Sequence, residues 1–352
     1  MENIQRLLEI AFTRNASDLH LVAGSPPCFR FNGELEFLRE EELLTEKDNE
    51  NLIFSLLNDE QKELLINNKE LDFSFNYSEK CRFRINAYYQ KDSLAAALRL
   101  VPNQIRGIAE LGLPDICFNI AKLKQGFVLV TGPAGHGKST TLAAIVDEIL
   151  RVRSCHVVMI EDPIEFVFKS NSSLISQRGL HQDTHSWANA LRAVLREDPD
   201  VILIGEMRDY ETIAAAMTIA ETGHLVFSTL HTNSAGQSID RILDSFPEET
   251  KNLAKIQLSS VLEIVLSQRL VPFVSGGRGL AYELMISNSA IRNTIREGKT
   301  HMIDNIIQTS ASVGMKTLQS CLEDLYKEKK ISIDTFKLYT TKAKEISGRS
   351  ST

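Results

Sequence analysis

The sequence predicts an α/β protein in which a smaller α+β domain precedes a larger domain built on a parallel sheet. From Gly126 onward, near-continuous apolar strands alternate with helices, which is typical of a parallel sheet buried on both faces. Before about residue 100, short strands and helices mix without that rhythm, as they do in α+β domains. A chain of 352 residues is long enough for two to three domains.

The N-terminal domain is expected over residues 1–100. Apolar residues at helical spacing from Ile4 to Phe12 predict an amphipathic helix, and a second helix is expected over Asn49–Leu65. The expected strands are Asp18–Val22, Cys28–Phe31, Leu71–Tyr77, Arg82–Gln90 and Leu94–Leu100. Prolines and glycines cluster after them, so residues 101–118 are interpreted as an interdomain linker.

The second domain is expected over residues 119–340 and begins with four strand–helix units. The strands are Phe127–Thr131, Val157–Ile160, Val201–Ile204 and Leu225–Leu230, and the helices are Thr140–Leu150, Trp187–Arg196, Tyr210–Glu221 and Ser234–Leu243. The remainder is mainly helical, with helices Lys251–Arg269, Ser289–Glu297, Met302–Gln308, Met315–Lys327 and Ser332–Tyr339 around one strand, Leu280–Ile286. Residues 341–352 are mostly small and polar without an apolar period, so we expect them to be disordered.

Composition argues against several classes of function. The net charge is −7 and the isoelectric point is near 5.7, so a nucleic-acid partner is not expected. The five cysteines are scattered without a C-x-x-C pair, which disfavours a structural zinc site and suits a reducing cytosol. We find no signal-peptide pattern and no run of about 20 apolar residues, so membrane association would be through a partner.

Residues 132–139 fit the phosphate-loop pattern G-x-x-x-x-G-K-[ST] between an apolar strand and a helix. The candidate nucleotide-binding residues are Gly132, Pro133, Ala134, Gly135, His136, Gly137, Lys138, Ser139 and Thr140. Glycines let backbone N–H groups turn toward phosphates, Lys138 supplies charge to the β- and γ-phosphates, and the Ser139 hydroxyl binds Mg²⁺. The His136 side chain is expected to point away from the phosphates, because the backbone forms the cradle.

Polar residues follow three more of the expected strands, at the edge where parallel sheets bind ligands. Glu161 and Glu165 follow the second strand, and either could orient or deprotonate an attacking water. Gly205 and Glu206 follow the third strand in a Walker B-like string, with glycine at the place of the usual aspartate. Glu206 is therefore the candidate carboxylate that would face either the Mg²⁺ ion or the attacking water. His231 follows the fourth and could sense the γ-phosphate, although a lone histidine there is more often structural.

Several uncommon strings occur in the order found in the type IV pilus retraction ATPases of the secretion ATPase superfamily, the GspE/PilT family. They are the phosphate loop, Ile160–Phe166, Gly205–Asp209, Glu221–His224 with Thr229–Thr232, and Ala290–Glu297. The chain resembles this family from Ser17 to about Leu338. The resemblance implies a PAS-like N-terminal domain, a RecA-like ATPase domain, ATP and Mg²⁺ as ligands, and a homohexamer. It also implies a cytoplasmic protein at the cytoplasmic face of the inner membrane, with a pilus platform protein as partner.

The resemblance also assigns roles to individual residues. Glu165 and Glu206 would be the main catalytic carboxylates, with His231 beside them. The arginines that would approach the nucleotide from the N-terminal domain are Arg82, Arg84 and Arg99. Arginines placed in this way offset charge in the transition state, an effect worth roughly 10³–10⁵ in rate in other enzymes. From their strand pattern alone, these arginines would be an ordinary solvated face.

Two features bear on which motor of the superfamily this is. Arg292 and Arg296 lie four residues apart on a short helix, and the resemblance implies a role for them in retraction. The four-cysteine metal site of assembly ATPases is excluded by the cysteine spacing. The family commonly has Thr, Ser and Leu where this chain has Ala134, His136 and Thr294, which bears on hydrolysis rate rather than nucleotide binding.

The sequence therefore predicts a hexameric ATP-hydrolysing motor for type IV pilus retraction. Two alternatives stay open at this point: a nucleic-acid motor on the same RecA-like core, and a nucleotide-gated accessory scaffold that scarcely hydrolyses ATP. The acidic balance disfavours the first, and the intact Glu165, Glu206 and His231 disfavour the second.

Overall fold

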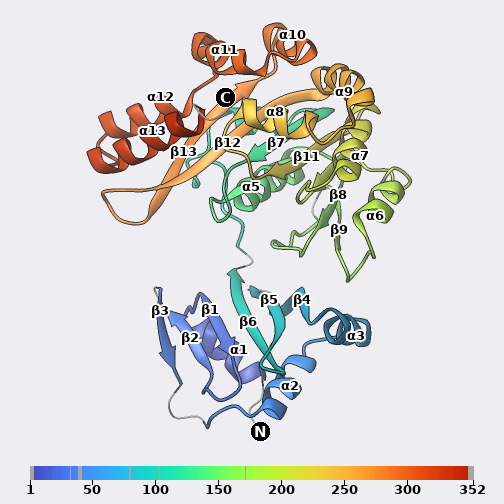
Figure 1. Cartoon of the computed structure of the whole chain (residues 1–352), viewed down its shortest axis with the longest axis vertical. Coiled ribbons are helices and arrows are strands. Elements are labelled where there is room, and N and C mark those ends of the chain that lie inside the picture. Colours follow the sequence, from blue (N-terminus) through green and yellow to red (C-terminus); the bar gives the residue numbers. More distant parts are fainter. Residues whose placement is uncertain are drawn as a thin grey trace. The chain divides into compact units, whose positions relative to one another are not determined.

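The computed structural model describes residues 4–31, 33–38, 42–78, 81–102, 104–170 and 172–347. The chain forms two compact units, coloured from blue to green and from green to red along the chain in Figure 1. Unit 1 comprises Met1–Gln104, Glu161–Val167 and Gln177–Ser186, and unit 2 comprises Ile105–Ile160, Phe168–Ser176 and Trp187–Thr352. Within the described ranges, no helix combines the length and apolarity that a membrane span requires.

Unit 1 is built on a six-stranded antiparallel sheet with the order β3-β2-β1-β6-β5-β4. The strands are β1 (Asp18–Leu21), β2 (Cys28–Phe31), β3 (Glu34–Phe37), β4 (Glu70–Ser78), β5 (Cys81–Gln90) and β6 (Ser93–Pro102). Alternate residues of β5, namely Phe83, Ile85 and Ala87, are fully buried. This period of two places one face of the sheet on the core.

Three helices, α1 (Ile4–Thr13), α2 (Glu46–Phe54) and α3 (Asp59–Asn68), accompany this sheet. The single helix expected over Asn49–Leu65 is wrong, because a second start signal interrupts it. Asn58 is extended, with φ −78° and ψ 173°, and forms a capping box with Gln61. A capping box satisfies the free N–H groups of a new helix, so the chain begins α3 there rather than continuing α2.

Unit 2 is built on a seven-stranded sheet with the order β13-β12-β7-β11-β10-β8-β9. The strands are β7 (Gly126–Thr131), β8 (His156–Glu161), β9 (Leu174–Gly179), β10 (Val201–Ile204), β11 (Leu225–Leu230), β12 (Leu262–Pro272) and β13 (Arg278–Ile286). The run from β12 to β8 is parallel, and β13 is antiparallel to β12. All residues of β7, β10 and β11 are buried, as expected for a sheet covered on both faces.

The helix expected over Lys251–Arg269 is also wrong. Helix α9 (Glu248–Val261) ends earlier, and the apolar run that follows it is β12. Ile264 and Leu266 pair with Val128 and Val130 of β7, so this run completes the central sheet. A short apolar run is compatible with a helix or a buried strand, and here the open edge of β7 selects the strand.

The remaining helices of unit 2 are α4 (Ile116–Ile120), α5 (Lys138–Val152), α6 (Trp187–Val194), α7 (Tyr210–Glu221), α8 (Ala235–Leu243), α10 (Ser289–Glu297), α11 (Ile303–Thr309), α12 (Leu318–Lys327) and α13 (Ile333–Ser347). Helix α13 continues to Ser347, and residues 348–352 lie outside the described part, so the expected disorder of residues 341–352 stays a prediction. The expected linker 101–118 begins inside β6 and ends inside α4.

Candidate active site

The phosphate loop leaves the buried strand β7 at Gly132 and enters helix α5 at Lys138. Gly132, Gly135 and Gly137 have φ values of 145°, 73° and 82°, a region that favours glycine. A Cβ atom on Gly132 would lie 2.5 Å from the carbonyl oxygen of Gln268 on β12. The loop therefore requires glycine at this position for two reasons: its backbone conformation and its contact with the neighbouring strand.

Lys138 is the first residue of α5, and its side chain turns back along the loop. Its Nζ atom donates to the carbonyl oxygens of Gly132, at 2.9 Å, and Pro133, at 3.2 Å. The residue is only 8% exposed. An ammonium group, glycine-rich backbone and a helix N-terminus together form the kind of site that binds phosphate.

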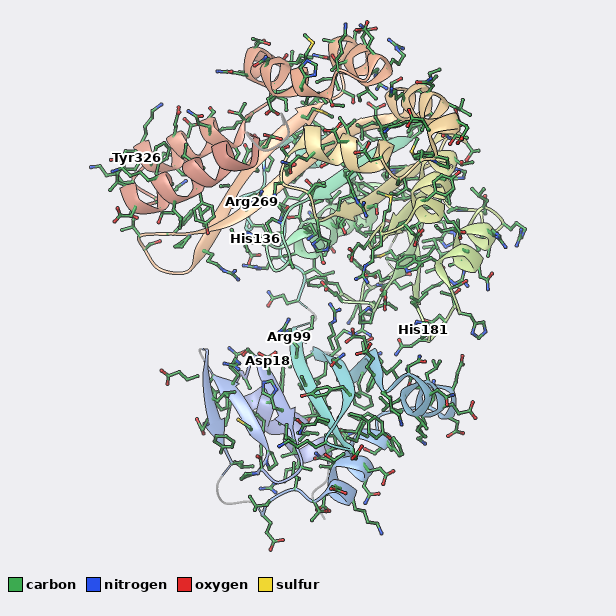
Figure 2. The ribbon with its side chains drawn as sticks, in the orientation of Figure 1. Asp18, Arg99, His136, His181, Arg269 and Tyr326 are labelled. Atoms are coloured by element: carbon green, nitrogen blue, oxygen red, sulfur yellow. The ribbon has the colours of Figure 1, made fainter. Side chains whose placement is uncertain are left out.

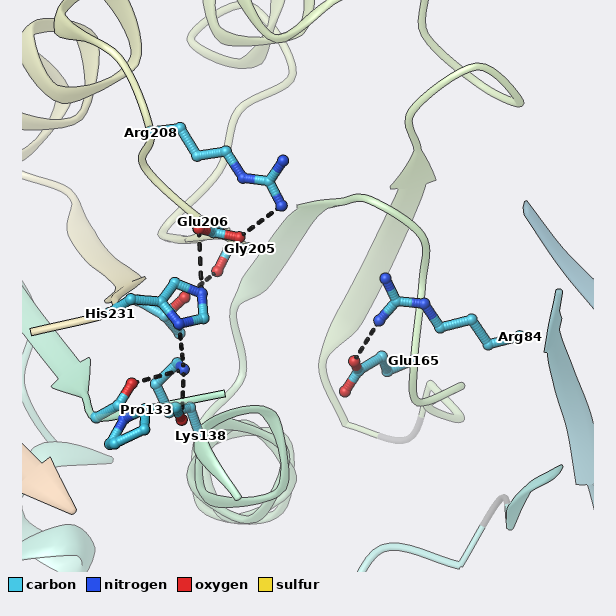
Figure 3. A network of polar contacts seen from close by, with 10 residues as sticks. Arg84, Pro133, Lys138, Glu165, Gly205, Glu206, Arg208 and His231 are labelled. Carbon is cyan, nitrogen blue, oxygen red and sulfur yellow. Dashed lines mark hydrogen bonds and ion pairs between the residues drawn. The ribbon is translucent and has the colours of Figure 1, made fainter. Parts of the chain in front are cut away.

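A chain of polar contacts links Lys138 to the Walker B segment (Figure 3). Lys138 Nζ lies 3.3 Å from Nδ1 of His231, and His231 Nε2 lies 3.1 Å from Oε1 of Glu206. Lysine can only donate, so Nδ1 is the acceptor and the ring proton of a neutral imidazole resides on Nε2, where it donates to Glu206. Arg208 Nη2 donates to the other Glu206 oxygen at 3.0 Å.

Glu206 is held as a carboxylate. Burial raises its pKa, but the hydrogen bond and charge of Arg208, with a contribution from His231, outweigh burial and place the pKa below its usual range. The preceding peptide is fixed from both sides, because Gly205 N donates to Ile160 O at 2.8 Å and Thr229 Oγ1 donates to Gly205 O at 2.6 Å. An ionised, oriented oxygen ligand of this kind suits Mg²⁺ or a water molecule.

The other two candidate carboxylates, Glu161 and Glu165, belong to unit 1. Arg84 on β5 forms an ion pair with Glu165 at 3.3 Å, which Figure 3 also shows. Glu161 is buried and accepts long hydrogen bonds from Glu165 N at 3.4 Å and Gln177 Nε2 at 3.5 Å. Gln177 also donates to Phe166 O at 2.7 Å, so Glu161 and Gln177 together hold the segment that carries Glu165.

Burial raises the pKa of Glu161 to about 8, far above the ordinary value of 4.5. The folded protein therefore holds a proton that the unfolded chain releases, and this group's contribution to stability is greatest at acid pH and falls as pH rises from about 4.5 to 8. We expect Glu161→Gln to remove this group's contribution to the fall in the free energy of unfolding with rising pH. Urea unfolding of both proteins between pH 5 and 9 checks this, and parallel pH profiles would contradict it.

The two other arginines of the N-terminal set have different surroundings. Arg82 is 4% exposed and donates through Nη2 to Ser74 Oγ at 2.8 Å, while its Nε and Nη1 atoms have no hydrogen-bond partner among the described residues. Burial lowers the pKa of Arg82 against the opposing charge of Glu161. Arg99 forms a 3.0 Å ion pair with Asp18, labelled in Figure 2. The approach of these arginines to a nucleotide stays a prediction.

Arg292 and Arg296 share helix α10 but differ in their contacts. Arg292 Nη1 donates to the carbonyl oxygens of Ser259, at 2.8 Å, and Ser260, at 2.7 Å, in the last turn of α9. Its Nη2 atom forms a 2.8 Å ion pair with Glu263. Arg296 is exposed. Arg292 thus caps a helix end, whereas Arg296 is a surface cation.

We therefore expect Arg292→Ala to lower the free energy of unfolding by about 1.5–3 kcal/mol, because three acceptors lose a charged donor. The matched variant Arg296→Ala should stay within about 0.5 kcal/mol of the wild type. Chemical denaturation of both variants measures the difference. Equal stabilities would mean that Arg292 does not support α9.

Sequence reasoning missed the contribution of β12 to the phosphate loop. Leu270 N donates to Nδ1 of His136 at 2.8 Å, and Gln268 Nε2 donates to His136 O at 2.6 Å. Arg269 Nη2 binds the Asn233 side chain at 2.7 Å. Gln268 and Arg269 fell inside the predicted helix Lys251–Arg269 and Leu270 directly followed it, and the signal for a strand was the apolar run Ile264–Leu266 before Pro272.

The fold and site define a class of protein. The parallel order β12-β7-β11-β10-β8, with a phosphate loop after β7 and a glutamate after β10, is a RecA-like P-loop ATPase core, and unit 1 is a smaller PAS-like domain. A family model described as "Type II/IV secretion system protein" matches residues 1–278. The chain belongs to this family.

Two relatives and one solved structure match nearly the whole chain. The type IV pilus retraction ATPase PilT of Pseudomonas aeruginosa is 46% identical over 92% of this chain and 94% of its own. A twitching motility protein of Neisseria gonorrhoeae is 44% identical over 93% of this chain and 87% of its own. The crystal structure of the pilus retraction motor PilT with bound ADP superposes with a TM-score of 0.88 at 46% identity, covering 96% of both chains.

Proposed function

We propose that this protein is an ATP-hydrolysing motor that drives type IV pilus retraction. The observation that carries the proposal is the Lys138–His231–Glu206 chain, which joins the phosphate loop to the Walker B carboxylate. It connects a phosphate-binding cation to an ionised carboxylate through one neutral imidazole. Through such a chain, a change at the γ-phosphate can alter the position of the group that orients the attacking water.

The residues divide the chemistry of ATP hydrolysis among them. The loop backbone and Lys138 bind the β- and γ-phosphates, and Glu206 orients a water for in-line attack. Mg²⁺, held by the Ser139 hydroxyl and the Glu206 carboxylate, would neutralise charge on the phosphate oxygens. Glu165 is the second catalytic carboxylate, paired with Arg84.

The work of the motor requires an assembly. We propose a homohexamer at the cytoplasmic face of the inner membrane that acts on a pilus platform protein. The P. aeruginosa relative is named as a type IV pilus retraction ATPase and matches over 92% of this chain, which supports a role in pilus retraction. The implied role of the Ala290–Glu297 segment in retraction fits the exposed cation Arg296, because a charge on the surface is accessible to a partner.

The first test is a steady-state ATPase assay of the full chain, with and without DNA. We expect hydrolysis that DNA does not stimulate and that Lys138→Ala abolishes. DNA-stimulated hydrolysis would indicate a nucleic-acid motor, and tight ATP binding without turnover would indicate an accessory scaffold.

The second test is pilus retraction in cells that carry Lys138→Ala. We expect retraction to stop while pilus assembly continues. Normal retraction by these cells would contradict the motor assignment, whatever the ATPase assay gives.

A further inference from the structure

His136 is held by strand β12 through both its backbone and its ring. The ring Nδ1 atom accepts from Leu270 N at 2.8 Å, and the carbonyl oxygen accepts from Gln268 Nε2 at 2.6 Å. The carbonyl of the same Gln268 packs against Gly132 at the other end of the loop. Strand β12 therefore contacts the phosphate loop at two points, and His136 provides one of them.

The strand pairing explains why backbone groups of β12 can bind the phosphate loop. Strand β12 pairs with β7 only as far as Ser267, opposite Thr131, because β7 then turns into the loop. Past Ser267, the side of β12 that faced β7 has lost its strand partner, while the other side continues along β13. The His136 ring satisfies the Leu270 N–H that the ladder no longer satisfies.

The hydrogen bond defines the protonation state of the ring. A backbone N–H can only donate, so Nδ1 carries no proton and the ring is the neutral Nε2–H tautomer. Burial, followed by the charges of Arg269, Arg278 and Lys138, lowers the pKa of His136 below its ordinary value of 6.5.

The other charged groups around His136 line the same cavity. This cavity of about 670 Å³ is bounded by the outer side of the loop, β12, β13, α8 and the helices α11 to α13. Besides Arg269, its ionisable groups are Glu283 of β13, Asp304 of α11, Lys316, Glu323 of α12 and Tyr339 of α13. Figure 2 labels His136 and Arg269. With these groups around it, the pKa of His136 is lowered by burial and by the three cations.

We propose that His136 is a positioning residue whose neutral ring fastens the phosphate loop to β12, and that protonation of this ring releases the loop and weakens nucleotide binding. The proposal rests on the proposed nucleotide-binding function. A protonated ring would present Nδ1–H to the Leu270 N–H, and two donors cannot share a hydrogen bond. The loop then loses the hydrogen bond from Leu270 N to the ring but keeps the one from Gln268 Nε2 to the His136 carbonyl oxygen and the contact at Gly132.

The sign of the pH dependence follows from the direction of the pKa shift. The fastened loop has a His136 pKa below 6.5, and a released loop has the ordinary value. Acid therefore favours the released loop increasingly as pH falls below 6.5, while above that value both states are neutral and the difference disappears.

The test measures the dissociation constant of a fluorescent methylanthraniloyl-ADP with Mg²⁺ for the full chain, from pH 5.5 to 8.0. The variant His136→Asn is the key comparison, because the asparagine Oδ1 occupies the position of Nδ1, accepts the same hydrogen bond and does not titrate. Dividing the wild-type constant by the H136N constant removes the titration of the nucleotide itself. His301→Asn is the matched control, since His301 is an exposed histidine of the same unit.

We expect the ratio of wild type to H136N to rise about threefold to tenfold from pH 8 to pH 5.5, the size expected for one lost hydrogen bond. H301N should follow the wild type throughout. His136→Leu, which has no acceptor, should bind about threefold to tenfold more weakly at every pH. Imidazole ¹⁵N shifts of the nucleotide-free protein should show His136 as the Nε2–H tautomer at pH 7.5.

A ratio that does not change with pH would overturn the inference and leave the proposed function intact. Tighter binding by the wild type at acid pH would also overturn it, because the ring would then act as a cation toward phosphate. Absence of nucleotide binding by the wild type at pH 8 would contradict the proposed function and the inference together.

Discussion

Replacing Glu206 with glutamine is expected to lower kcat for ATP hydrolysis by roughly 10²–10⁴-fold and to leave ATP affinity nearly unchanged. The carboxylate lies between His231 Nε2 and Arg208 Nη2, at 3.1 Å and 3.0 Å, and its lowered pKa keeps it ionised. Glutamine has almost the same shape but no charge. The substitution therefore removes the negative charge proposed to bind Mg²⁺ and to orient the water, and it replaces one carboxylate oxygen with an amide NH₂ group, while the phosphate loop stays as it is.

The measurement is single-turnover hydrolysis alongside equilibrium ATP binding. Glu211→Gln is a suitable control, because Glu211 lies exposed in the first turn of α7, five residues further along the chain. Its kcat should match that of the wild type. Unchanged turnover in the Glu206→Gln variant would remove Glu206 from the mechanism, and loss of ATP binding would show that its role is in binding rather than catalysis.

The second large effect is expected for Gly132→Ala, which should lower the free energy of unfolding by about 2–4 kcal/mol and abolish nucleotide binding. Alanine is strained at a φ of 145°, and its Cβ atom would lie 2.5 Å from the Gln268 carbonyl oxygen. That oxygen belongs to the backbone of a central strand, so it cannot move aside as a flexible side chain would. Relief of this contact requires a shift of the β12 backbone or of the phosphate loop.

Gly135→Ala separates these two causes. Gly135 also has a positive φ, 73°, but no atom of the described residues lies within 4 Å of the Cβ position, so the conformational strain of about 1–3 kcal/mol is the expected cost. Denaturant unfolding of the nucleotide-free variants gives both values. If Gly135→Ala cost as much as Gly132→Ala, the contact with Gln268 would contribute nothing.

Local patterns predicted the parts of the site that depend on nearby residues. The phosphate loop, the glutamate after β10 and the histidine after β11 each follow a short apolar strand, and strands that all run parallel bring such residues to one edge. The contacts Lys138–His231 and His231–Glu206 show that these three side chains lie together, and their roles in catalysis stay a prediction.

The elements that were predicted wrongly share a different cause. After α2 ends at Phe54, Asn58 begins a new helix inside a segment whose apolar spacing looked continuous, because capping competes with propensity. The run after Val261 became a strand because β7 offered an open edge to it. Neither choice is visible in the spacing of apolar residues alone.

The sequence by itself determined that this protein has a phosphate loop with a lysine, a Walker B glutamate and a parallel sheet to hold them, since each is a pattern of neighbouring residues. The tertiary structure alone decided which groups His136 and Arg292 contact. Their partners Leu270 and Ser259 lie 134 and 33 residues away in the chain. A hydrogen bond requires distance and direction in space, and residue spacing gives neither until the sheet and the helices are in place.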